Sequence, residues 1–181
     1  MYYQIINVGK EEIGLVWGNS EKKPQLEYIY LSNPKVKLVT RIVKDFPEIN
    51  KSQRKIPSGI DNLITKLYLG QKTNIDLSLL NLTRLSEFSA KVLKATCKIP
   101  PGKVATYSGI AAKIRATLAA RAVGTALANN PFPVVIPCHR VVRSDGSLGG
   151  FGGGMNMKRE LLTKEGVSFD STGRVSAKCI W

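Results

Sequence analysis

Metal-binding side chains are scarce in this 181-residue chain, which has a single histidine, His139, and three cysteines. The cysteines, Cys97, Cys138 and Cys179, form no Cys-x-x-Cys pair. A zinc site of the cysteine and histidine kind would have to gather ligands from across the whole chain. We therefore expect neither a metal nor a cofactor. The odd number of cysteines leaves at least one free thiol, and a disulfide between Cys97 and Cys179 is one hypothesis for the other two.

Long apolar runs are also missing. No stretch approaches the roughly 20 residues that a bilayer-spanning helix needs. The first residues, MYYQIINVGKEEIG, lack the basic segment and apolar stretch of a secretory signal. These features predict a cytoplasmic protein, or a nuclear one in a eukaryote, with no membrane partner.

Acidic residues are few. The chain has 13 Asp and Glu against 27 Lys and Arg, a formal net charge of +14. A surplus of this size favours a polyanionic partner, because neutralised phosphates release their counterions. General solubility is the alternative interpretation. The net charge alone favours a nucleic-acid partner, but it does not exclude the alternative.

The first 80 residues predict a small α/β domain. Residues that favour strands gather in three segments: Tyr2–Val8, Ile13–Trp17 and Gln25–Leu31. Apolar residues at helical spacing follow over Lys35–Phe46, and again from near Pro57 to Gly70. Nothing in this segment points to chemistry, so we interpret residues 1–80 as a scaffold domain.

Residues 81–181 predict a second domain that is mainly helical. A helix is expected over Thr83–Lys98, followed by two short helices, Tyr107–Ile114 and Leu118–Ala128, in the outline of a helix-turn-helix. The last of these, LAARAVGTALA, consists of small residues around Arg121. Recognition helices usually carry several base-reading side chains. This helix therefore predicts contact through shape and one inserted side chain, with an alanine-rich core helix as the alternative.

The strongest chemical signal is Cys138 followed directly by His139, in the apolar stretch PFPVVIPCHRVV. Adjacent side chains of an extended backbone point to opposite faces, so a water is one plausible link between His139 as base and the thiol. Such a base needs an orienting carboxylate, and Glu160, Glu165 and Asp170 are the candidates. A packed cysteine beside a hydrogen-bonded histidine is the alternative.

A glycine-rich loop, GSLGGFGGG, occupies residues 146–154. It lacks the ending of a phosphate-binding loop, so nucleotide binding is not expected there. Its glycines predict a pliable wall close to a ligand, with Phe151 as an aromatic lid. A helix over Met155–Glu165 with Gly166 as its cap is expected next, and then a small hairpin over Val167–Val175.

Four motifs in one continuous order resemble the O6-alkylguanine-DNA alkyltransferases. They are IPPGKVATY (99–107), ARAVGTALANNP (120–131), PVVIPCHRVV (133–142) and the glycine-rich loop before KRELLTKEG (158–166), and the resemblance covers about residues 82–176. It implies a ribonuclease-H-like α/β domain followed by a winged-helix-like domain with the helix-turn-helix. It also implies a monomer that binds the minor groove of double-stranded DNA and flips the damaged base into a pocket.

The activity that the resemblance implies is a direct-reversal repair. An alkyl group, such as methyl, moves irreversibly from O6-alkylguanine in DNA, and from O4-alkylthymine, to Cys138. By motif position, His139 is the base that acts through water and Glu165 is the carboxylate that orients it. Asn130 is the hinge that braces the site, and Tyr107 rotates the nucleotide and donates a proton to the leaving guanine. A thioether has no carbonyl for water to attack, so each molecule reacts once.

The same resemblance assigns contacts to DNA and to the base. Arg121 takes the place of the extruded base in the stack. The other expected DNA contacts are Tyr107, Ser108, Ala120, Gly124 and Ser144. The expected pocket residues are Pro133, Val141 through its backbone, Gly149, Phe151 and Gly152.

The chain departs from the family pattern at several positions. Phe151 stands where many relatives have tyrosine, so stacking is kept and a hydroxyl is lost. Gly152 offers only a backbone donor to the O6 atom, and Ala128 gives no cation for a phosphate. The zinc ligands of some relatives' N-terminal domains have no counterpart here.

Three other interpretations compete with this one. A lesion binder without chemistry would have its acceptor cysteine replaced, and Cys138 argues against that class. A DNA-binding regulator is a poor fit, because base-reading side chains are scarce. A thiol hydrolase using Cys138, His139 and Glu165 would turn over an ester and would not need the positive charge.

Overall fold

The N-terminal part of the chain forms a four-stranded sheet. The computed structural model describes residues 1–19, 24–53, 55–56 and 59–181. The strands are β1 (Tyr2–Val8), β2 (Glu11–Asn19), β3 (Pro24–Leu31) and β4 (Asn50–Gln53), in the order β3-β2-β1-β4. Neighbours pair antiparallel except β4, which is parallel to β1. The three predicted strands are confirmed, and β4 was not predicted.

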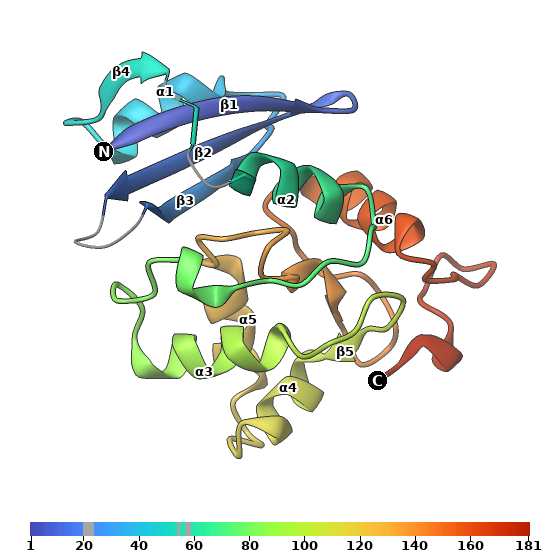
Figure 1. The fold of residues 1–181 in the computed structure, drawn as a ribbon. Coiled ribbons are helices and arrows are strands. Elements are labelled where there is room, and N and C mark those ends of the chain that lie inside the picture. Colours follow the sequence, from blue (N-terminus) through green and yellow to red (C-terminus); the bar gives the residue numbers. More distant parts are fainter. Residues whose placement is uncertain (20–23, 54, 57–58) are drawn as a thin grey trace.

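The alternation of apolar residues gives this sheet two buried faces. One face packs against α1 (Leu38–Asp45) through a cluster of seven buried residues: Tyr3, Val16, Tyr30, Leu38, Ile42, Phe46 and Ile49. The other face carries Ile13, Leu15 and Ile29 into the main core. The sheet therefore separates α1 from the rest of the molecule, as the upper part of Figure 1 shows.

The helices of this part are shorter than predicted. The prediction placed a start at Lys35, but residues 34–37 form a turn and a bend, and Lys37 is the cap of α1. Helix α2 spans Ile60–Tyr68, so its predicted end near Gly70 is confirmed within two residues. Its predicted start at Pro57 lies outside the described residues.

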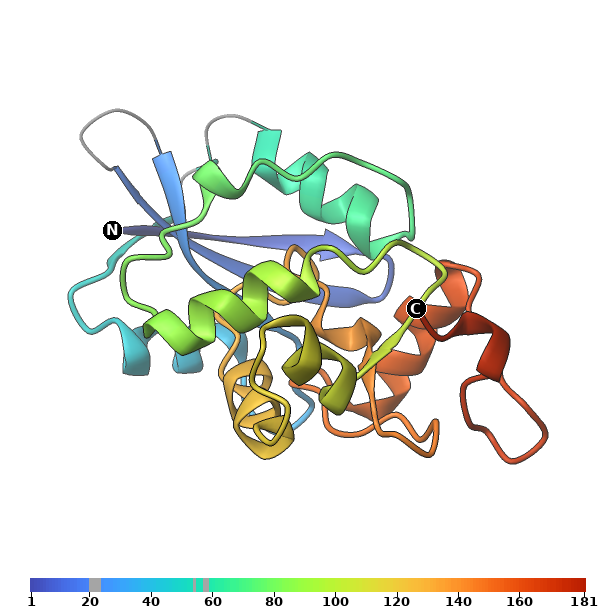
Figure 2. The same ribbon diagram turned by 90° about the horizontal axis from the view of Figure 1, so that it is seen from below.

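The helix-turn-helix outline is present. Helix α3 (Glu87–Thr96) is capped by Ser86, α4 (Tyr107–Lys113) is capped by Thr106, and α5 (Ala120–Ala128) follows a short turn. The predicted start of the first of these helices at Thr83 is wrong, because Ser86 accepts a hydrogen bond from Ser89 N and fixes the start there. Figure 2 shows α4 and α5 side by side with α3 alongside them.

Two short strands join the helical part to the chemical motif. Strand β5 (Ala105–Thr106) runs directly into α4, and β6 (Val141–Val142) comes directly after the Cys-His-Arg turn. They pair in parallel, with Ala105 opposite Val141 and Thr106 opposite Val142. This pairing brings the start of α4 next to the chemical motif, although 30 residues of sequence lie between them.

Helix α6 (Gly154–Lys164) ends as predicted. Gly166 has φ +88, its N–H donates to Thr163 O, and Val167 N donates to Leu162 O. This is the Schellman arrangement, which glycine at that position favours. The chain then makes a single antiparallel bridge, between Phe169 and Val175, in place of a longer hairpin.

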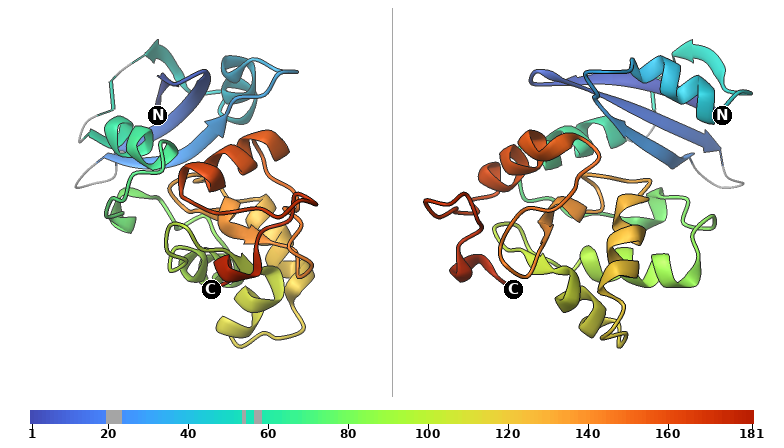
Figure 3. Two further views of the ribbon diagram at one scale, coloured as in Figure 1. Left: turned by 90° about the vertical axis from the view of Figure 1, so that its right-hand side faces the viewer. Right: turned by 180° about the vertical axis from the view of Figure 1, so that it is seen from behind.

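Contacts between the two halves are extensive. Ile29 N on β3 donates to Pro131 O at 2.8 Å. The Lys164 ammonium lies 4.3 Å from the Tyr68 ring centroid, so α6 runs beside α2, as both views of Figure 3 show. The largest buried cluster holds side chains from the sheet, from α2 and from the helical part. The division into domains at residue 80 stays a prediction.

The predicted disulfide is wrong, because all three cysteines are free thiols. Cys97 packs against the main core, whereas Cys179 belongs to a separate cluster with Val104 and Val167. Cys179 Sγ instead lies 3.5 Å from Ser168 Oγ. The two thiols are therefore held in different parts of the molecule.

Candidate active site

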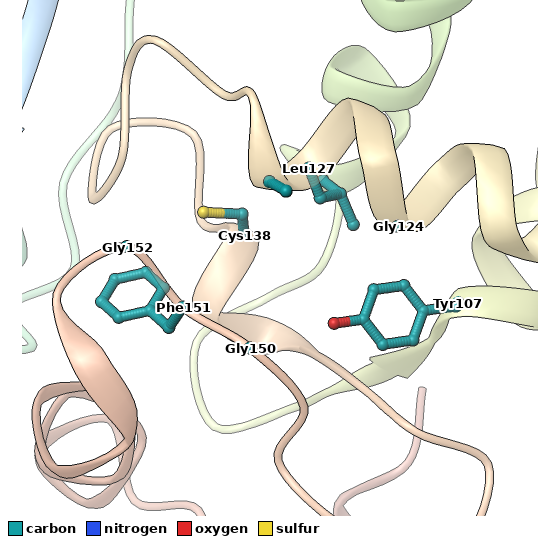
Figure 4. Close-up of a pocket in the computed structure, with 8 residues that line it drawn as sticks. Tyr107, Gly124, Leu127, Cys138, Gly150, Phe151 and Gly152 are labelled. Atoms are coloured by element: carbon teal, nitrogen blue, oxygen red, sulfur yellow. The ribbon is translucent and has the colours of Figure 1, made fainter.

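Cys138 and His139 lie on one turn of 3-10 helix, η3 (Cys138–Arg140), that follows Pro137. Both are buried, with exposed fractions of 9% for Cys138 and 2% for His139. Cys138 lines a cavity of about 420 Å³ between α5 and the glycine-rich loop. Figure 4 shows its walls, and the Tyr107 hydroxyl points into the same space from the start of α4. The cavity is lined by Tyr107, Gly124, Leu127, Ala128, Cys138, Gly150, Phe151 and Gly152.

Glu165 is the carboxylate that the structure brings to His139. Its Oε1 lies 2.9 Å from His139 Nε2. The other two candidates are engaged elsewhere: Glu160 pairs with Lys10 and Lys164, and Asp170 accepts hydrogen bonds within its own turn. Of the three alternatives that the sequence left open, only Glu165 can orient the imidazole.

Arg140 joins His139 and Glu165 in a buried hydrogen-bonded network, and sequence reasoning missed it. Its Nε donates to Glu165 Oε2 and its Nη2 to Oε1, both at 2.8 Å. Its Nη1 donates to Ile99 O at 2.6 Å. Such two-point pairing fixes the plane of a carboxylate as well as its charge. Arg140 therefore holds Glu165 in the orientation that meets His139.

The network keeps a neutral imidazole beside a carboxylate. Burial by itself raises the pKa of Glu165, but hydrogen bonds from His139 and Arg140 outweigh it and lower that pKa to about 2. Burial lowers the pKa of His139, against the opposing influence of Glu165. An ionised carboxylate only accepts hydrogen bonds, so the His139 proton lies on Nε2. His139 Nδ1 is then an acceptor, and it has no hydrogen-bond partner among the described residues.

The thiol itself is not pre-ionised. Burial raises the pKa of Cys138, and the Asn130 side chain and the Lys158 charge only partly oppose this. A buried thiol with a raised pKa is protonated at neutral pH. A base is therefore required before Cys138 can act as a nucleophile.

Asn130 braces the turn that leads to the thiol. Its Nδ2 donates to Ile136 O at 3.1 Å, and its Oδ1 accepts from Phe132 N at 3.0 Å. Inside this turn Val134 has φ +74, a conformation that costs a β-branched residue energy. The two hydrogen bonds of Asn130 help to offset that strain and fix the path into Cys138.

Lys158 is a second residue that sequence reasoning missed. It is fully buried on α6, and its Nζ donates to Val141 O at 2.7 Å and to Gly150 O at 3.4 Å. Burial lowers its pKa to about 8. Lys158 thus ties β6 to the glycine-rich loop. Leu161 and Leu162 lie three and four residues after Lys158, which places Lys158 on the apolar face of α6. This helical spacing is the sequence signal by which Lys158 could have been found.

The predicted pocket residues are only partly brought together. Phe151 and Gly152 line the main cavity, and Pro133 lines a smaller one beside it. Gly149 lies against Tyr107, since a Cβ there would be 2.8 Å from the hydroxyl oxygen. Val141 is fully buried and is not among the residues that line either cavity, and its carbonyl accepts a hydrogen bond from Lys158. Its predicted backbone contact with the base stays a prediction.

The predicted DNA contacts lie on and around α4 and α5. Arg121, Ser108 and Ser144 are exposed, whereas Ala120 and Gly124 are half-buried. Gly124 lies beside the Tyr107 ring, since a Cβ there would be 3.8 Å from Cε1. The exposed face of α5 therefore offers small side chains around one guanidinium.

Comparison with known proteins agrees with this geometry. Residues 87–167 match the family model described as "6-O-methylguanine DNA methyltransferase, DNA binding domain". The methylated-DNA--protein-cysteine methyltransferase of Methanosarcina barkeri is 35% identical over 167 residues, which cover 91% of this chain and 97% of that protein. The chain belongs to this methyltransferase family.

Other members of the family are similar over different lengths. The Methanothermobacter thermautotrophicus methyltransferase is 43% identical, and the match spans 63% of this chain and 65% of that protein. The crystal structure of Mycobacterium tuberculosis OGT in complex with DNA is 30% identical, with a TM-score of 0.73 over 91% of this chain and 92% of that one. The chain thus has the mixed α/β fold of these methyltransferases.

The described residues contain no group of three or more His, Cys, Asp or Glu side chains placed to hold a metal ion. No helix among them has the length and apolar character needed to cross a membrane.

Proposed function

We propose that this protein repairs DNA by moving an alkyl group, such as methyl, from the O6 atom of guanine to Cys138. O4-alkylthymine is the second substrate. The observation that carries the proposal is the Cys138 thiol, which lines the main cavity and is backed by the buried His139–Glu165–Arg140 network. Family membership and the solved DNA complex of the Mycobacterium tuberculosis relative support it.

The chemistry needs a proton acceptor and a proton donor. His139 Nδ1 takes the thiol proton through a water, and Glu165 stabilises the imidazolium that forms. Sγ attacks the alkyl carbon, the Sγ–C bond forms, and the C–O6 bond breaks with its electron pair going to guanine. Burial raises the pKa of Tyr107, so its hydroxyl is protonated at neutral pH and can give that proton to the leaving base. The proton on His139 then restores Tyr107.

The transfer happens once per molecule. The product is a thioether, and the site holds no group that could cleave an S–C bond. This distinguishes the proposal from a thiol hydrolase, in which water attacks an acyl intermediate. The protein is consumed as a reagent.

DNA binds as a double helix through its minor groove, to a monomer of the protein. The net charge of +14 supplies affinity for phosphates. The small exposed side chains of α5 allow close approach, and Arg121 fills the place of the base that is flipped into the cavity. Tyr107, Ser108, Ala120, Gly124 and Ser144 are the remaining contacts.

We further propose that residues 1–80 form a ribonuclease-H-like scaffold domain and that residues 81–181 form a winged-helix-like domain with the helix-turn-helix. The antiparallel β1–β2–β3 sheet with a parallel β4 supports the first assignment. The α4–α5 pair and the short β5–β6 sheet support the second.

Intact-mass measurement tests the proposal. The protein is mixed with an excess of duplex DNA carrying one O6-methylguanine, and Cys138→Ser is the matched control. We expect a gain of one methyl group in the wild type and none in the variant. Tight binding to the lesion without any gain in mass would instead identify a lesion sensor.

A further inference from the structure

A second cavity adjoins the Cys138 thiol on the side of the N-terminal sheet. It has a volume of about 140 Å³. It shares Cys138, Phe151 and Gly152 with the main cavity, and β3 and α1 close its far side. Figure 4 shows the Cys138 sulfur directed toward Phe151 and Gly152 and away from the Tyr107 hydroxyl. A substituent on the carbon that reaches the sulfur can therefore extend into this second cavity.

Arg41 of α1 is the one charged side chain among the residues that line the second cavity. Its Nη1 donates to Leu31 O at 2.8 Å, and its guanidinium carbon lies 5.1 Å from the Tyr30 ring centroid. These contacts hold the side chain in place but use only one of its five N–H donors. No ion pair of Arg41 is found among the described residues.

The neighbouring carboxylate, Asp45, forms no ion pair with Arg41 within the part of the chain that the structure describes. Asp45 accepts a hydrogen bond from the Tyr30 hydroxyl at 2.7 Å, and it is not among the residues that line the second cavity. Apart from the Cys138 thiol and Gly152, the other lining residues have aromatic, aliphatic or amide side chains. A half-buried cation in a small, otherwise uncharged cavity favours an anion of matching size.

We propose that Arg41 makes this cavity a subsite for an anionic substituent on the transferred group. The substrate class is O6-carboxymethylguanine and similar adducts, whose alkyl carbon carries a carboxylate. The inference rests on the proposed alkyl transfer and assigns Arg41 as the residue that sets the preference of the same site for a charged alkyl group. The cavity has the volume of four to five waters at ~30 Å³ each, which accommodates a carboxylate.

The transfer proceeds as for methyl. The bond from Sγ to the CH₂ carbon forms, and the bond from that carbon to O6 breaks with its electron pair going to guanine. Guanine also receives the proton that the thiol gives up. The carboxylate keeps its charge throughout and accepts hydrogen bonds from the Arg41 guanidinium before and after the transfer.

The test compares single-turnover rates on three duplexes that carry O6-methyl-, O6-carboxymethyl- or neutral O6-carbamoylmethylguanine. Carbamoylmethyl has nearly the same size as carboxymethyl but no charge. We expect the wild type to favour carboxymethyl over carbamoylmethyl, and Arg41→Met to reduce this ratio about tenfold. Arg41→Lys, which keeps the charge, should retain part of the preference. Lys44→Met removes an exposed charge from the same helix and should leave the ratio unchanged.

The outcomes separate this inference from the proposed function. If methyl is transferred but the ratio is the same in the wild type, Arg41→Met and Arg41→Lys, the subsite assignment is overturned and the repair activity stands. If no duplex gives transfer to Cys138, the proposed function fails and the subsite with it. Because the ratio is taken within each variant, a general loss of folded protein does not change it.

Discussion

At the scale of single residues, the site depends on three buried groups that are useful only together. His139 accepts a proton because burial keeps it neutral, and Glu165 holds the imidazole by Nε2. Glu165 in turn keeps its charge because Arg140 pairs with both of its oxygens. Loss of the carboxylate would leave Arg140 as an unpaired buried cation, which proteins tolerate poorly.

Glu165→Gln should therefore both slow the reaction and weaken the fold. We expect the free energy of unfolding to fall by about 3–5 kcal/mol, the usual effect of breaking a buried ion pair. The single-turnover rate should fall by about 100-fold or more, since the base loses its orienting group. Urea unfolding and rapid-quench kinetics measure the two effects. Glu160→Gln, whose partners are surface lysines, is the control and should change neither by much.

Lowering the pH should remove the contribution of ionised Glu165 to the free energy of unfolding over a defined range of pH. Its pKa is about 2 in the folded protein, below the ordinary value of 4.5. A lowered carboxyl pKa stabilises the fold above the ordinary value, and this stabilisation is lost as the pH falls toward 2. The difference in unfolding free energy between the wild type and Glu165→Gln should thus shrink between pH 5 and pH 3. A constant difference over that range would contradict the assignment.

At the scale of elements, the glycine-rich loop and the start of α4 fit closely against each other. Gly149 has φ +69, and a Cβ there would meet the Tyr107 hydroxyl at 2.8 Å. Lys158 reaches from α6 to hold both Gly150 O and Val141 O. The loop is therefore fixed to two elements at once.

Gly149→Ala should strain this contact. The backbone conformation and the clash with Tyr107 together should cost about 1–3 kcal/mol of stability. Gly150→Ala is a close control, because a Cβ at Gly150 meets nothing within 4 Å and its φ is not positive. Thermal or urea unfolding of the two variants gives the comparison, and equal stabilities would argue against a tight fit at Gly149.

Lys158→Met should change stability in a pH-dependent way. The folded pKa of Lys158 is about 8, below the ordinary 10.5. Keeping this ammonium buried therefore costs stability below pH 8, and the cost disappears as the pH rises toward 10.5. Relative to the variant, the wild type should gain stability between pH 7.5 and pH 10. Urea unfolding at the two pH values checks this, and a wild type that loses stability would contradict it.

The elements show which parts of the fold can be predicted from local patterns. The strands β1, β2 and β3 alternate apolar residues, and the four later helices have apolar residues at helical spacing, so each was predicted. Strand β4, with the sequence NKSQ, is short and polar and exists only because it pairs with β1. No local signal can reveal such a pairing.

The residues of the site divide in the same way, into those that a local sequence pattern reveals and those that it does not. Cys138, His139 and Glu165 were found because they stand in motifs, and the structure places them together. Arg140, Lys158 and Arg41 were missed, because their roles depend on contacts that form only in the folded chain: Arg140 with the Glu165 carboxylate, Lys158 with Val141 O and Gly150 O, and Arg41 with Leu31 O. Of these three residues, only Lys158 has a signal in the sequence, because it is a lysine on the apolar face of its helix.

At the scale of the whole molecule, the two halves form a single scaffold around the thiol. The N-terminal sheet contributes no residue to the main cavity, yet β3 contacts Pro131, and β3 and α1 wall the second cavity. The N-terminal half thus supports the turn that carries Cys138. Positive charge is spread over both halves, which suits a protein that scans a long polyanion.

Arg121→Ala should separate DNA binding from chemistry. Because Arg121 is exposed on α5, its replacement should leave the fold unaffected, and Arg121 is not among the residues that line the cavity of Cys138. We expect slower transfer from a lesion in duplex DNA, since nothing fills the place of the flipped base, and little change with the free alkylated base. Lys113→Ala, on the neighbouring helix, is the control for loss of one positive charge. Equal loss on the free base and on duplex DNA would contradict the role given to Arg121.

In the proposed reaction, each protein molecule is consumed as it repairs one lesion. The most direct measurement is to incubate a limiting amount of protein with excess O6-methylguanine duplex until the reaction stops. The repaired guanines are then counted per protein, and the methylated peptide is mapped. We expect one repair per molecule, with the methyl group on Cys138. Several repairs per molecule, or a methyl group on any other residue, would contradict it.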